Sequence, residues 1–431
     1  MELKEVKGVT FVDGGVCASK GFRANGIHCG LAHKPLTSTK ENSAVANNAL
    51  SSAKKKNDLA IIVADKECTV SAVYTTNKVK GAPILVTKEH IKNGKARAVI
   101  VNSVNANTCN ADGVEKAEKM CRLVAEEIGI DENDVVVAST GVIGQVLPIE
   151  PIANGMKELV EGLSYDGNSK AVEAIMTTDT QVKEVAVKFE LGGKICTMGG
   201  MLKGSGMIHP NMATTLTFIT TDVDISAELL QRALSDVVKV TLNRVSVDGD
   251  TSTNDMVCVL ANGTAENVPV TKENEDFEKF VNALYAVMMN LARKMARDGE
   301  GATKLIECIC HGADTEKTAE IVAKSVITSS LFKAAMFGED ANWGRILCAV
   351  GYADADFDIN KVGVSIGSEK GFIEVCRNGA GVEFSEEKAK EILSEEEIII
   401  NISIGNGAGK AVAWGCDLTY DYVKINGDYR S

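Results

Sequence analysis

The chain has 431 residues, of which 45% are hydrophobic and 24% are charged, and its formal net charge at pH 7 is −13. These values are typical of a globular protein with two or three domains, and they exclude disordered, collagen-like and coiled-coil chains. The negative charge disfavours nucleic acids and anionic membranes as partners.

Short strands and one polar insertion are predicted in the first part of the chain. Residues 58–65 (DLAIIVAD) and 71–77 (SAVYTTN) are rich in Val, Ile and Tyr, which predicts two separate strands within a run of short strands over 57–103. Residues 33–56 contain few large apolar side chains. They form either a surface loop or an exposed helix from 43 to 55, and the sequence leaves both readings open.

A helix, a buried strand and a hairpin are predicted next. Apolar residues at helical spacing predict a helix over 114–128, and the apolar run at 134–140 predicts a buried strand. Residues 168–183 begin as a helix and then open into MTTDTQ. Alternating apolar residues over 185–191, a Gly-Gly turn and a return over 194–198 predict a β-hairpin.

The second half is richer in helices. Amphipathic patterns, with Ser226 and Ser385 as N-caps, predict helices over 226–242, 274–297, 316–336 and 386–393. Because three of the seven tyrosines fall in the last twelve residues, we expect the C-terminus to be docked. Hairpins mixed with helices, without a regular β-α-β rhythm, predict an α/β or α+β layered fold with mixed sheets.

Cysteine and histidine usage argues against disulfides and metal sites. None of the twelve cysteines forms a C-x-x-C pair, and we expect Cys308 and Cys310 on one face of a strand. The five histidines include no i, i+4 pair and no H-E-x-x-H motif, so no metal is expected. The N-terminal segment lacks an apolar signal region and no apolar run reaches 18 residues, so we expect a reducing cytoplasm and no membrane span.

The most unusual segment is KGSGMIHPNMATTLTF, residues 203–218. Its glycines permit a tight, strained turn before Ala213, and Thr214 then stands where this loop enters a strand. Such a hydroxyl can attack the preceding carbonyl carbon, and hydrolysis of the resulting ester frees an N-terminal threonine. The freed α-amine titrates near pH 8 and can act as a general base. An ordinary glycine-rich turn before a threonine-rich strand has the same pattern.

This segment resembles the self-cleavage motif of the glutamate N-acetyltransferase (ornithine acetyltransferase) family, with the cut between Ala213 and Thr214. The 33–56 insertion is longer than in that family. Other segments resemble the family in the same order along nearly the whole chain: VYTTNKVKGAP (73–83), VNSVNANTCN (101–110), STGVIGQVLP (139–148), AIMTTDT (174–180), SVDGDTSTND (246–255), RDGEGATK (297–304), FGEDANWGRI (337–346) and TYDYVKINGDYRS (419–431).

The resemblance implies roles for individual residues. Thr214 would be the nucleophile, and Thr140 and Gly141 would form an oxyanion hole, in which one lost donor costs about 3 kcal/mol of barrier. The residues implied to contact substrate are Thr177, Lys203, Thr214, Glu300, Asn426 and Ser431. Without the resemblance, the first of these is typical of a helix cap, Lys203 of a solvated surface, and Glu300 of a residue that follows a helix end.

The resemblance also implies a ping-pong reaction. Thr214 would take an acetyl group from N2-acetylornithine and release ornithine, and glutamate would then collect the group as N-acetylglutamate. Some family members also accept acetyl-CoA as donor. Cleavage would give an N-terminal chain (1–213) and a C-terminal chain (214–431) that assemble as (αβ)2. The implied fold is the α/β layered sandwich of self-processing enzymes, with no cofactor and with no nucleic-acid or membrane partner.

Two other functions are compatible with the residues. A self-cleaving aminopeptidase or amidohydrolase would use the same nucleophile with water as acceptor, and a non-catalytic binding protein would remain uncut. Two ligand motifs fail. The acidic run 248–255 is no calcium loop, because its positions 6 and 12 would be Thr253 and Val259. GSGMIH is no phosphate-binding Walker loop, because no G-K-[ST] follows.

Overall fold

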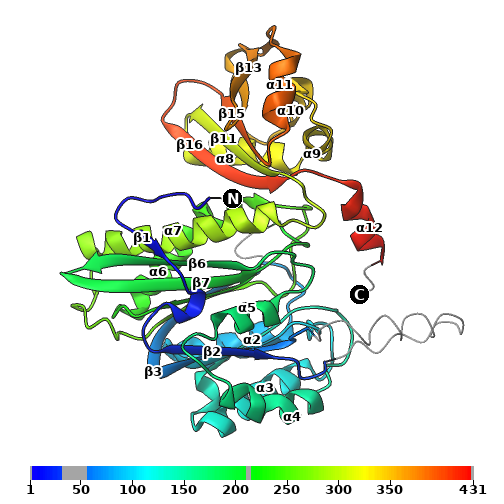
Figure 1. Ribbon diagram of the computed structural model, residues 1–431. Coiled ribbons are helices and arrows are strands. Elements are labelled where there is room, and N and C mark those ends of the chain that lie inside the picture. Colours follow the sequence, from blue (N-terminus) through cyan, green and yellow to red (C-terminus); the bar gives the residue numbers. More distant parts are fainter. Residues whose placement is uncertain (1, 32–55, 210–214, 429–431) are drawn as a thin grey trace, which may run out of the picture.

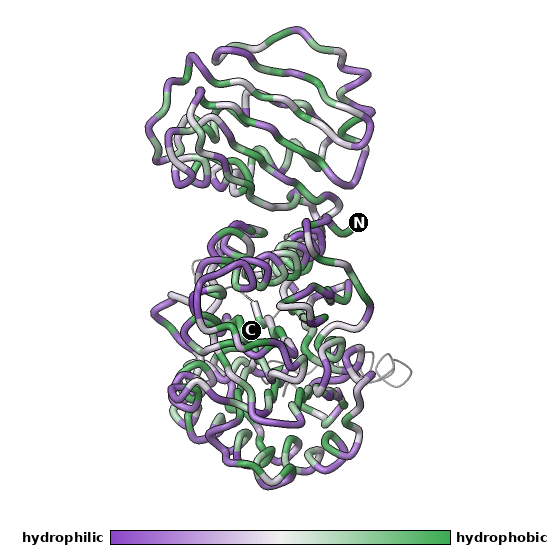
Figure 2. Tube along the Cα trace, turned by 90° about the vertical axis from the view of Figure 1, so that its left-hand side faces the viewer, coloured by the Kyte–Doolittle hydropathy of each residue, from purple (hydrophilic) through white to green (hydrophobic). Residues whose placement is uncertain are grey.

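The computed structural model describes residues 2–31, 56–209 and 215–428, which form two bodies stacked one above the other (Figure 1). Among these residues, the larger body contains a nine-stranded sheet and the smaller one a seven-stranded sheet. Figure 2 shows the two bodies again after a quarter turn. Each sheet combines parallel and antiparallel pairs, so the predicted layered α/β fold with mixed sheets is confirmed.

The larger sheet interleaves strands from both halves of the chain. Its order is β1-β6-β7-β8-β10-β3-β4-β5, with β2 paired to β3. The parallel pair β8 and β10 lies in the middle, and β7 and β3 flank it in antiparallel orientation. The strands are β1 (Thr10–Val12), β2 (Phe22–Ile27), β3 (Leu59–Tyr74), β4 (Lys95–Asn102), β5 (Val135–Ser139), β6 (Lys183–Leu191), β7 (Lys194–Lys203), β8 (Leu216–Thr221) and β10 (Met256–Ala261).

Helices cover both faces of this sheet, and strand alternation explains how the cores divide. On β8, Phe218 belongs to the core under α5, whereas Ile219 faces the core under α6 and α7. On β3, Ile62 joins the first of these cores and Ile61 faces α3 and α4. The helices are α2 (Ala82–His90), α3 (Gly113–Ile128), α4 (Glu150–Glu161), α5 (Asn168–Ile175), α6 (Ala227–Val240) and α7 (Glu275–Arg297).

The smaller sheet has the order β14-β13-β12-β15-β11-β16-β9. Its strands are β9 (Val245–Ser246), β11 (Leu305–Ala313), β12 (Gly363–Ser368), β13 (Gly371–Arg377), β14 (Ala380–Gly381), β15 (Glu397–Ser403) and β16 (Gly409–Cys416). Its core also includes residues of α8 (Glu316–Thr328), α9 (Ser330–Phe337), α10 (Trp343–Gly351) and α11 (Glu386–Leu393). The last helix, α12 (Tyr420–Asp428), descends from this body along the side of the larger one (Figure 1).

Five short 3-10 helices complete the described secondary structure: η1 (Gly15–Cys17), η2 (Ile91–Asn93), η3 (Glu132–Asp134), η4 (Leu242–Arg244) and η5 (Ile359–Lys361). In the described part of the chain, no helix combines the length and the apolar character that crossing a bilayer requires. Except for Lys56, the 33–56 insertion lies outside the described residues, so its two readings stay predictions.

Most of the predicted elements are confirmed. The helices over 114–128, 226–242, 274–297 and 386–393 correspond to α3, α6, α7 and α11, and the side chains of Ser226 and Ser385 cap α6 and α11 as predicted. The hairpin is β6–β7, and both turn glycines have positive φ. Cys308 and Cys310 are buried on β11, two residues apart.

Three predictions are wrong. The strands 58–65 and 71–77 are one strand, β3, because it pairs with β2 and β4 first and with β10 later. Its charged middle, residues 65–67, interrupts the apolar pattern but not the strand. The region 57–103 also contains a helix, α2, with Pro83 in its first turn. The predicted helix 316–336 is two helices, because Ser329 is extended and its side chain caps α9.

Candidate active site

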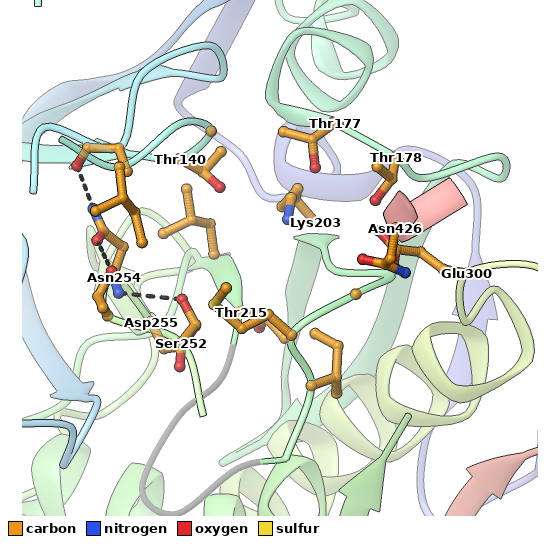
Figure 3. A pocket seen from close by; sticks show the side chains of 18 residues that line it. Thr140, Thr177, Thr178, Lys203, Thr215, Ser252, Asn254, Asp255, Glu300 and Asn426 are labelled. Atoms are coloured by element: carbon orange, nitrogen blue, oxygen red, sulfur yellow. Dashed lines mark hydrogen bonds between the residues drawn. The ribbon is translucent and has the colours of Figure 1, made fainter. Parts of the chain in front are cut away.

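A pocket lies between loops that come from distant parts of the sequence (Figure 3). One wall follows β5, another follows α5, and a third contains the end of β7 with the turn after it. The remaining walls are the start of β8 with Thr215 before it, the loop before β10, the turn after α7, and α12. The predicted site residues that line this pocket are Thr140, Gly141, Thr177, Lys203, Glu300 and Asn426.

The corner after β5 offers two hydrogen-bond donors. The N–H of Thr140 donates to Asn102 O (2.9 Å), so that residue offers the pocket only its hydroxyl. Gly141 has φ +122°, and a Cβ there would lie 2.1 Å from Val104 O, so only glycine fits. Among the described residues, no acceptor is found for the Gly141 N–H. This N–H and the Thr140 hydroxyl are donors of the kind that an oxyanion hole needs.

A buried amide fastens this corner to the second half of the chain. Asn254 Nδ2 donates to Ala106 O (2.6 Å) and to Ser139 O (2.9 Å), the last residue of β5. Its Oδ1 accepts from the hydroxyls of Thr108 (2.6 Å) and Thr253 (2.7 Å). All the hydrogen-bonding capacity of this side chain is therefore used, which fixes the loop before β10 against the loop after β4 and the end of β5.

The next residue, Asp255, places a carboxyl group in the pocket wall. It is 3% exposed, and its Oδ2 has no hydrogen-bond partner among the residues that the structure describes. Burial raises the pKa of this carboxyl well above its ordinary value, although Ser252 and Lys203 act in the opposite direction. Burial thus acts on this carboxyl in favour of its neutral form.

Thr177, in the wall that follows α5, and Lys203, in the wall at the end of β7, are tied to each other. Lys203 is the last residue of β7, and the N–H of Gly204 after it donates to Asp179 Oδ1 (2.8 Å). The other oxygen of the same carboxylate accepts from the Thr177 N–H (3.0 Å). One buried carboxylate thus holds both residues in place.

Glu300 and Asn426 also line the pocket and are bonded to each other. Asn426 Nδ2 donates to Glu300 Oε2 (2.7 Å), and the Glu300 N–H donates to Ser205 O (3.1 Å). A Cβ on Gly206 would lie 2.3 Å from Glu300 Cδ, so this glutamate packs directly on the glycine backbone. The C-terminal segment, which we expect to be docked, makes this contact through α12, although Tyr420 is 85% exposed.

The predicted strained turn directly before Ala213 lies outside the described residues, but the described part of the glycine-rich segment contains a strained turn at Met207. Met207 has φ 57°, a conformation that non-glycine residues rarely adopt. Asp248 holds this turn, because its carboxylate accepts from the N–H groups of Met207 (2.7 Å) and Ile208 (2.9 Å). The acidic run 248–255 therefore supports the backbone of the glycine-rich segment.

The predicted residues Ala213, Thr214 and Ser431 lie outside the described residues. Thr215, which follows the predicted nucleophile in the chain, is described and lines the pocket. Six of the predicted residues therefore line one pocket, and Thr215 lines the same pocket.

Comparisons with known proteins identify the family. The model of the ArgJ family matches residues 44–431. The chain belongs to the ArgJ family. The arginine biosynthesis bifunctional protein ArgJ of Caldanaerobacter subterraneus subsp. tengcongensis is 47% identical over 97% of this chain and 99% of its own length. ArgJ 1 of Clostridium acetobutylicum is 49% identical over 87% of this chain and 92% of its own length. A solved structure of ArgJ from Bacillus halodurans is 46% identical, covers 49% of this chain and 98% of its own, and has a TM-score of 0.47.

In this ArgJ-family chain, the pocket residues that the sequence prediction missed include Thr178, Ser252, Asn254 and Asp255. The last three belong to the acidic run 248–255, for which the sequence analysis assigns no site residue. A signal was present in its hydroxyl and amide side chains, which are typical of a polar wall rather than of a metal site. Among residues 2–31, 56–209 and 215–428, no group of three or more His, Cys, Asp or Glu side chains is arranged to hold a metal ion.

Proposed function

We propose that this ArgJ-family chain transfers an acetyl group from N2-acetylornithine to glutamate in arginine biosynthesis, with Thr214 as the nucleophile. The observation that carries this proposal is the pocket, where two oxyanion-hole donors, a lysine, a glutamate and Thr215 meet. Membership of the ArgJ family supports the same reaction. The proposed donor, acceptor and products are small molecules, and we further propose that no cofactor is needed and that the site of action is the cytoplasm.

In the first half-reaction, the Thr214 hydroxyl attacks the acetyl carbonyl carbon of N2-acetylornithine. The α-amine of the same residue takes the hydroxyl proton and passes it to the nitrogen that leaves as the amine of ornithine. The C–N bond of the acetamide breaks, and an acetyl ester remains on Thr214. The Thr140 hydroxyl and the Gly141 N–H bind the oxyanion that forms on the acetyl oxygen.

In the second half-reaction, the α-amine of glutamate attacks the ester carbon. The new C–N bond gives N-acetylglutamate as the ester C–O bond to Thr214 breaks, and the threonine oxygen recovers its proton from the attacking amine. Lys203 pairs with a substrate carboxylate, and Glu300 with a substrate ammonium group. Thr177, Asn426 and Ser431 complete the substrate contacts, and acetyl-CoA is a second acetyl donor to be tested.

Self-cleavage between Ala213 and Thr214 precedes this chemistry, because it frees the α-amine. It divides the chain into pieces of 213 and 218 residues, 1–213 and 214–431. The proposed assembly contains two copies of each piece. The mass of denatured protein and N-terminal sequencing test this step directly. We expect Thr214→Ala to remain a single inactive chain, and an active, cut Thr214→Ala protein would contradict the mechanism.

An assay with N2-acetylornithine, with and without glutamate, separates transfer from hydrolysis. We expect ornithine to form in proportion to N-acetylglutamate and to need glutamate beyond the first turnover. Ornithine release that continues without glutamate would instead favour an amidohydrolase. A chain that is never cut and binds these compounds without turnover would favour a binding protein.

A further inference from the structure

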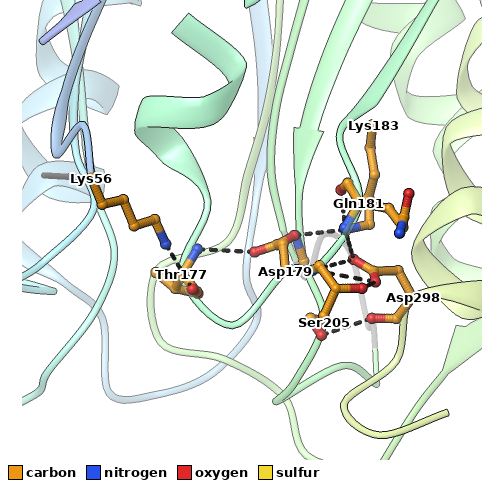
Figure 4. A network of polar contacts seen from close by, with 9 residues as sticks. Lys56, Thr177, Asp179, Gln181, Lys183, Ser205 and Asp298 are labelled. Atoms are coloured by element: carbon orange, nitrogen blue, oxygen red, sulfur yellow. Dashed lines mark hydrogen bonds and ion pairs between the residues drawn. The ribbon is translucent and has the colours of Figure 1, made fainter. Parts of the chain in front are cut away.

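Three buried charges lie behind the wall that contains Lys203: Asp179, Lys183 and Asp298 (Figure 4). Lys183 Nζ lies 2.7 Å from Asp179 Oδ1 and also pairs with Asp298 Oδ2. The Lys183 side chain is 0% exposed, and those of the two aspartates are 0% and 4% exposed. Burying these charges is tolerated only because they are paired and hydrogen-bonded.

The cluster holds the backbone of three pocket loops. Asp179 accepts from the N–H groups of Thr177 and Gly204, as described above. Asp298 accepts from the N–H groups of residues 180 and 181 and from the Thr180 hydroxyl. Its own carbonyl oxygen accepts from the Ser205 hydroxyl (2.7 Å). A change of charge at the centre of this cluster therefore acts on the pocket wall directly.

Two lysines lie next to the Asp179 carboxylate, because Lys203 directly precedes Gly204, whose N–H donates to it. Burial opposes its ionisation, but Lys183 and Lys203 hold its pKa well below the ordinary range, so it carries a negative charge. Lys183 is in contact with it, whereas Lys203 forms no ion pair with any described residue. A third cation, Lys56, is already bonded through Nζ to Thr177 O (2.8 Å).

We propose that Lys183 is a positioning residue of this site: as the counter-ion of Asp179, it leaves the Lys203 ammonium available for a carboxylate of the substrate. That Lys203 binds a carboxylate of the substrate rests on the proposed function. The pairing of Lys183 with Asp179 does not depend on it. Without Lys183, the net negative charge behind the wall draws Lys203 towards Asp179 and out of the pocket.

The kinetic test compares a variant that lacks the Lys183 charge with one that lacks the charges of both Lys183 and Asp179. In Lys183→Met, we expect KM for glutamate to rise about tenfold or more, because a charge-assisted hydrogen bond is lost, while kcat changes much less. The double variant Lys183→Met/Asp179→Asn removes the carboxylate that captures Lys203, so we expect its KM to return towards the wild-type value. A merely structural role predicts the opposite, because the two defects would add. A double variant with a KM as high as that of Lys203→Met overturns the proposal, and this comparison remains available if Lys183→Met does not fold.

A second readout is independent of the reaction. A brief treatment with an N-hydroxysuccinimide acetate reagent, read by peptide mass spectrometry, reports whether Lys203 is accessible. We expect Lys203 to react in the wild type and in the double variant, and to be protected in Lys183→Met. Equal labelling in all three proteins overturns the proposal. If the wild type transfers no acetyl group but shows this labelling pattern, the proposed function fails and the role of Lys183 stands.

Discussion

At the scale of single residues, the donors after β5 carry the sharpest prediction. Thr140→Val keeps the shape of the side chain but removes its hydroxyl, which is the only donor that this residue offers to the pocket. We expect kcat to fall by about 100-fold or more with little change in KM, since an oxyanion forms only during reaction. Thr140→Ser is the matched control, because it keeps the hydroxyl. Equal kcat values for Thr140→Val and wild type would contradict the assignment.

The absence of a side chain at Gly206 leaves the space that the Glu300 carboxylate occupies. In Gly206→Ala, the new methyl group would lie 2.3 Å from Glu300 Cδ, so the carboxylate has to move. Loss of one hydrogen bond to a charged group is expected to raise the substrate KM by about tenfold. The control is Gly351→Ala, since a Cβ there meets nothing within 4 Å. KM should be measured on protein whose cleaved fraction has been determined by mass, and an unchanged KM would show that Glu300 does not bind substrate.

The ionisation of His209 is expected to make the stability of the folded chain depend on pH. Burial, and secondly the charge of Lys324, lower its pKa from 6.5 to about 4. As the pH falls from 6.5 towards 4, the unfolded chain takes up a proton on this ring before the folded chain does, so the folded state loses stability. We expect the fall in Tm between pH 7.5 and pH 5 to be smaller in His209→Gln than in the wild type. Equal falls in thermal melts would refute this.

At the scale of elements, α12 is expected to serve the pocket more than the fold. None of its residues is buried, but Asn426 bonds to Glu300. A chain that ends at Thr419 should therefore keep a Tm close to that of the wild type and lose substrate affinity. Asn426→Ala, which retains the rest of the helix, should raise KM by about tenfold. A large loss of Tm on truncation would instead make α12 a structural element.

At the scale of the whole molecule, the sheet predicts that cleavage does not separate the two pieces. Strands β8 and β10 follow the cut, and they lie between β7 and β3, which precede it. Separating the pieces would break both antiparallel ladders and open the core under α6 and α7. We expect the cut pieces to elute together under native conditions and to separate only in concentrated guanidinium. Separation in native buffer would be inconsistent with this sheet.

The sequence alone determined those elements that depend on contacts between residues close together in the chain. The capping serines Ser226 and Ser385, the Gly-Gly hairpin and the amphipathic stripe of α7 depend on contacts within a few residues, so they could be predicted. The site residues Thr140, Lys203 and Glu300 were predicted through motifs rather than through their contacts. That they share one pocket was not visible from their spacing.

The tertiary structure decided what depends on partners far along the chain. It joined two predicted strands into β3, because three neighbouring strands pair with it along its length. It also brought Asn254 against Ser139, and Lys183 against Asp298, which lies 115 residues away. The physical reason is the same in each case. A hydrogen bond or a charge pair across such separations forms only when the path of the chain closes the distance, and no local pattern records that path.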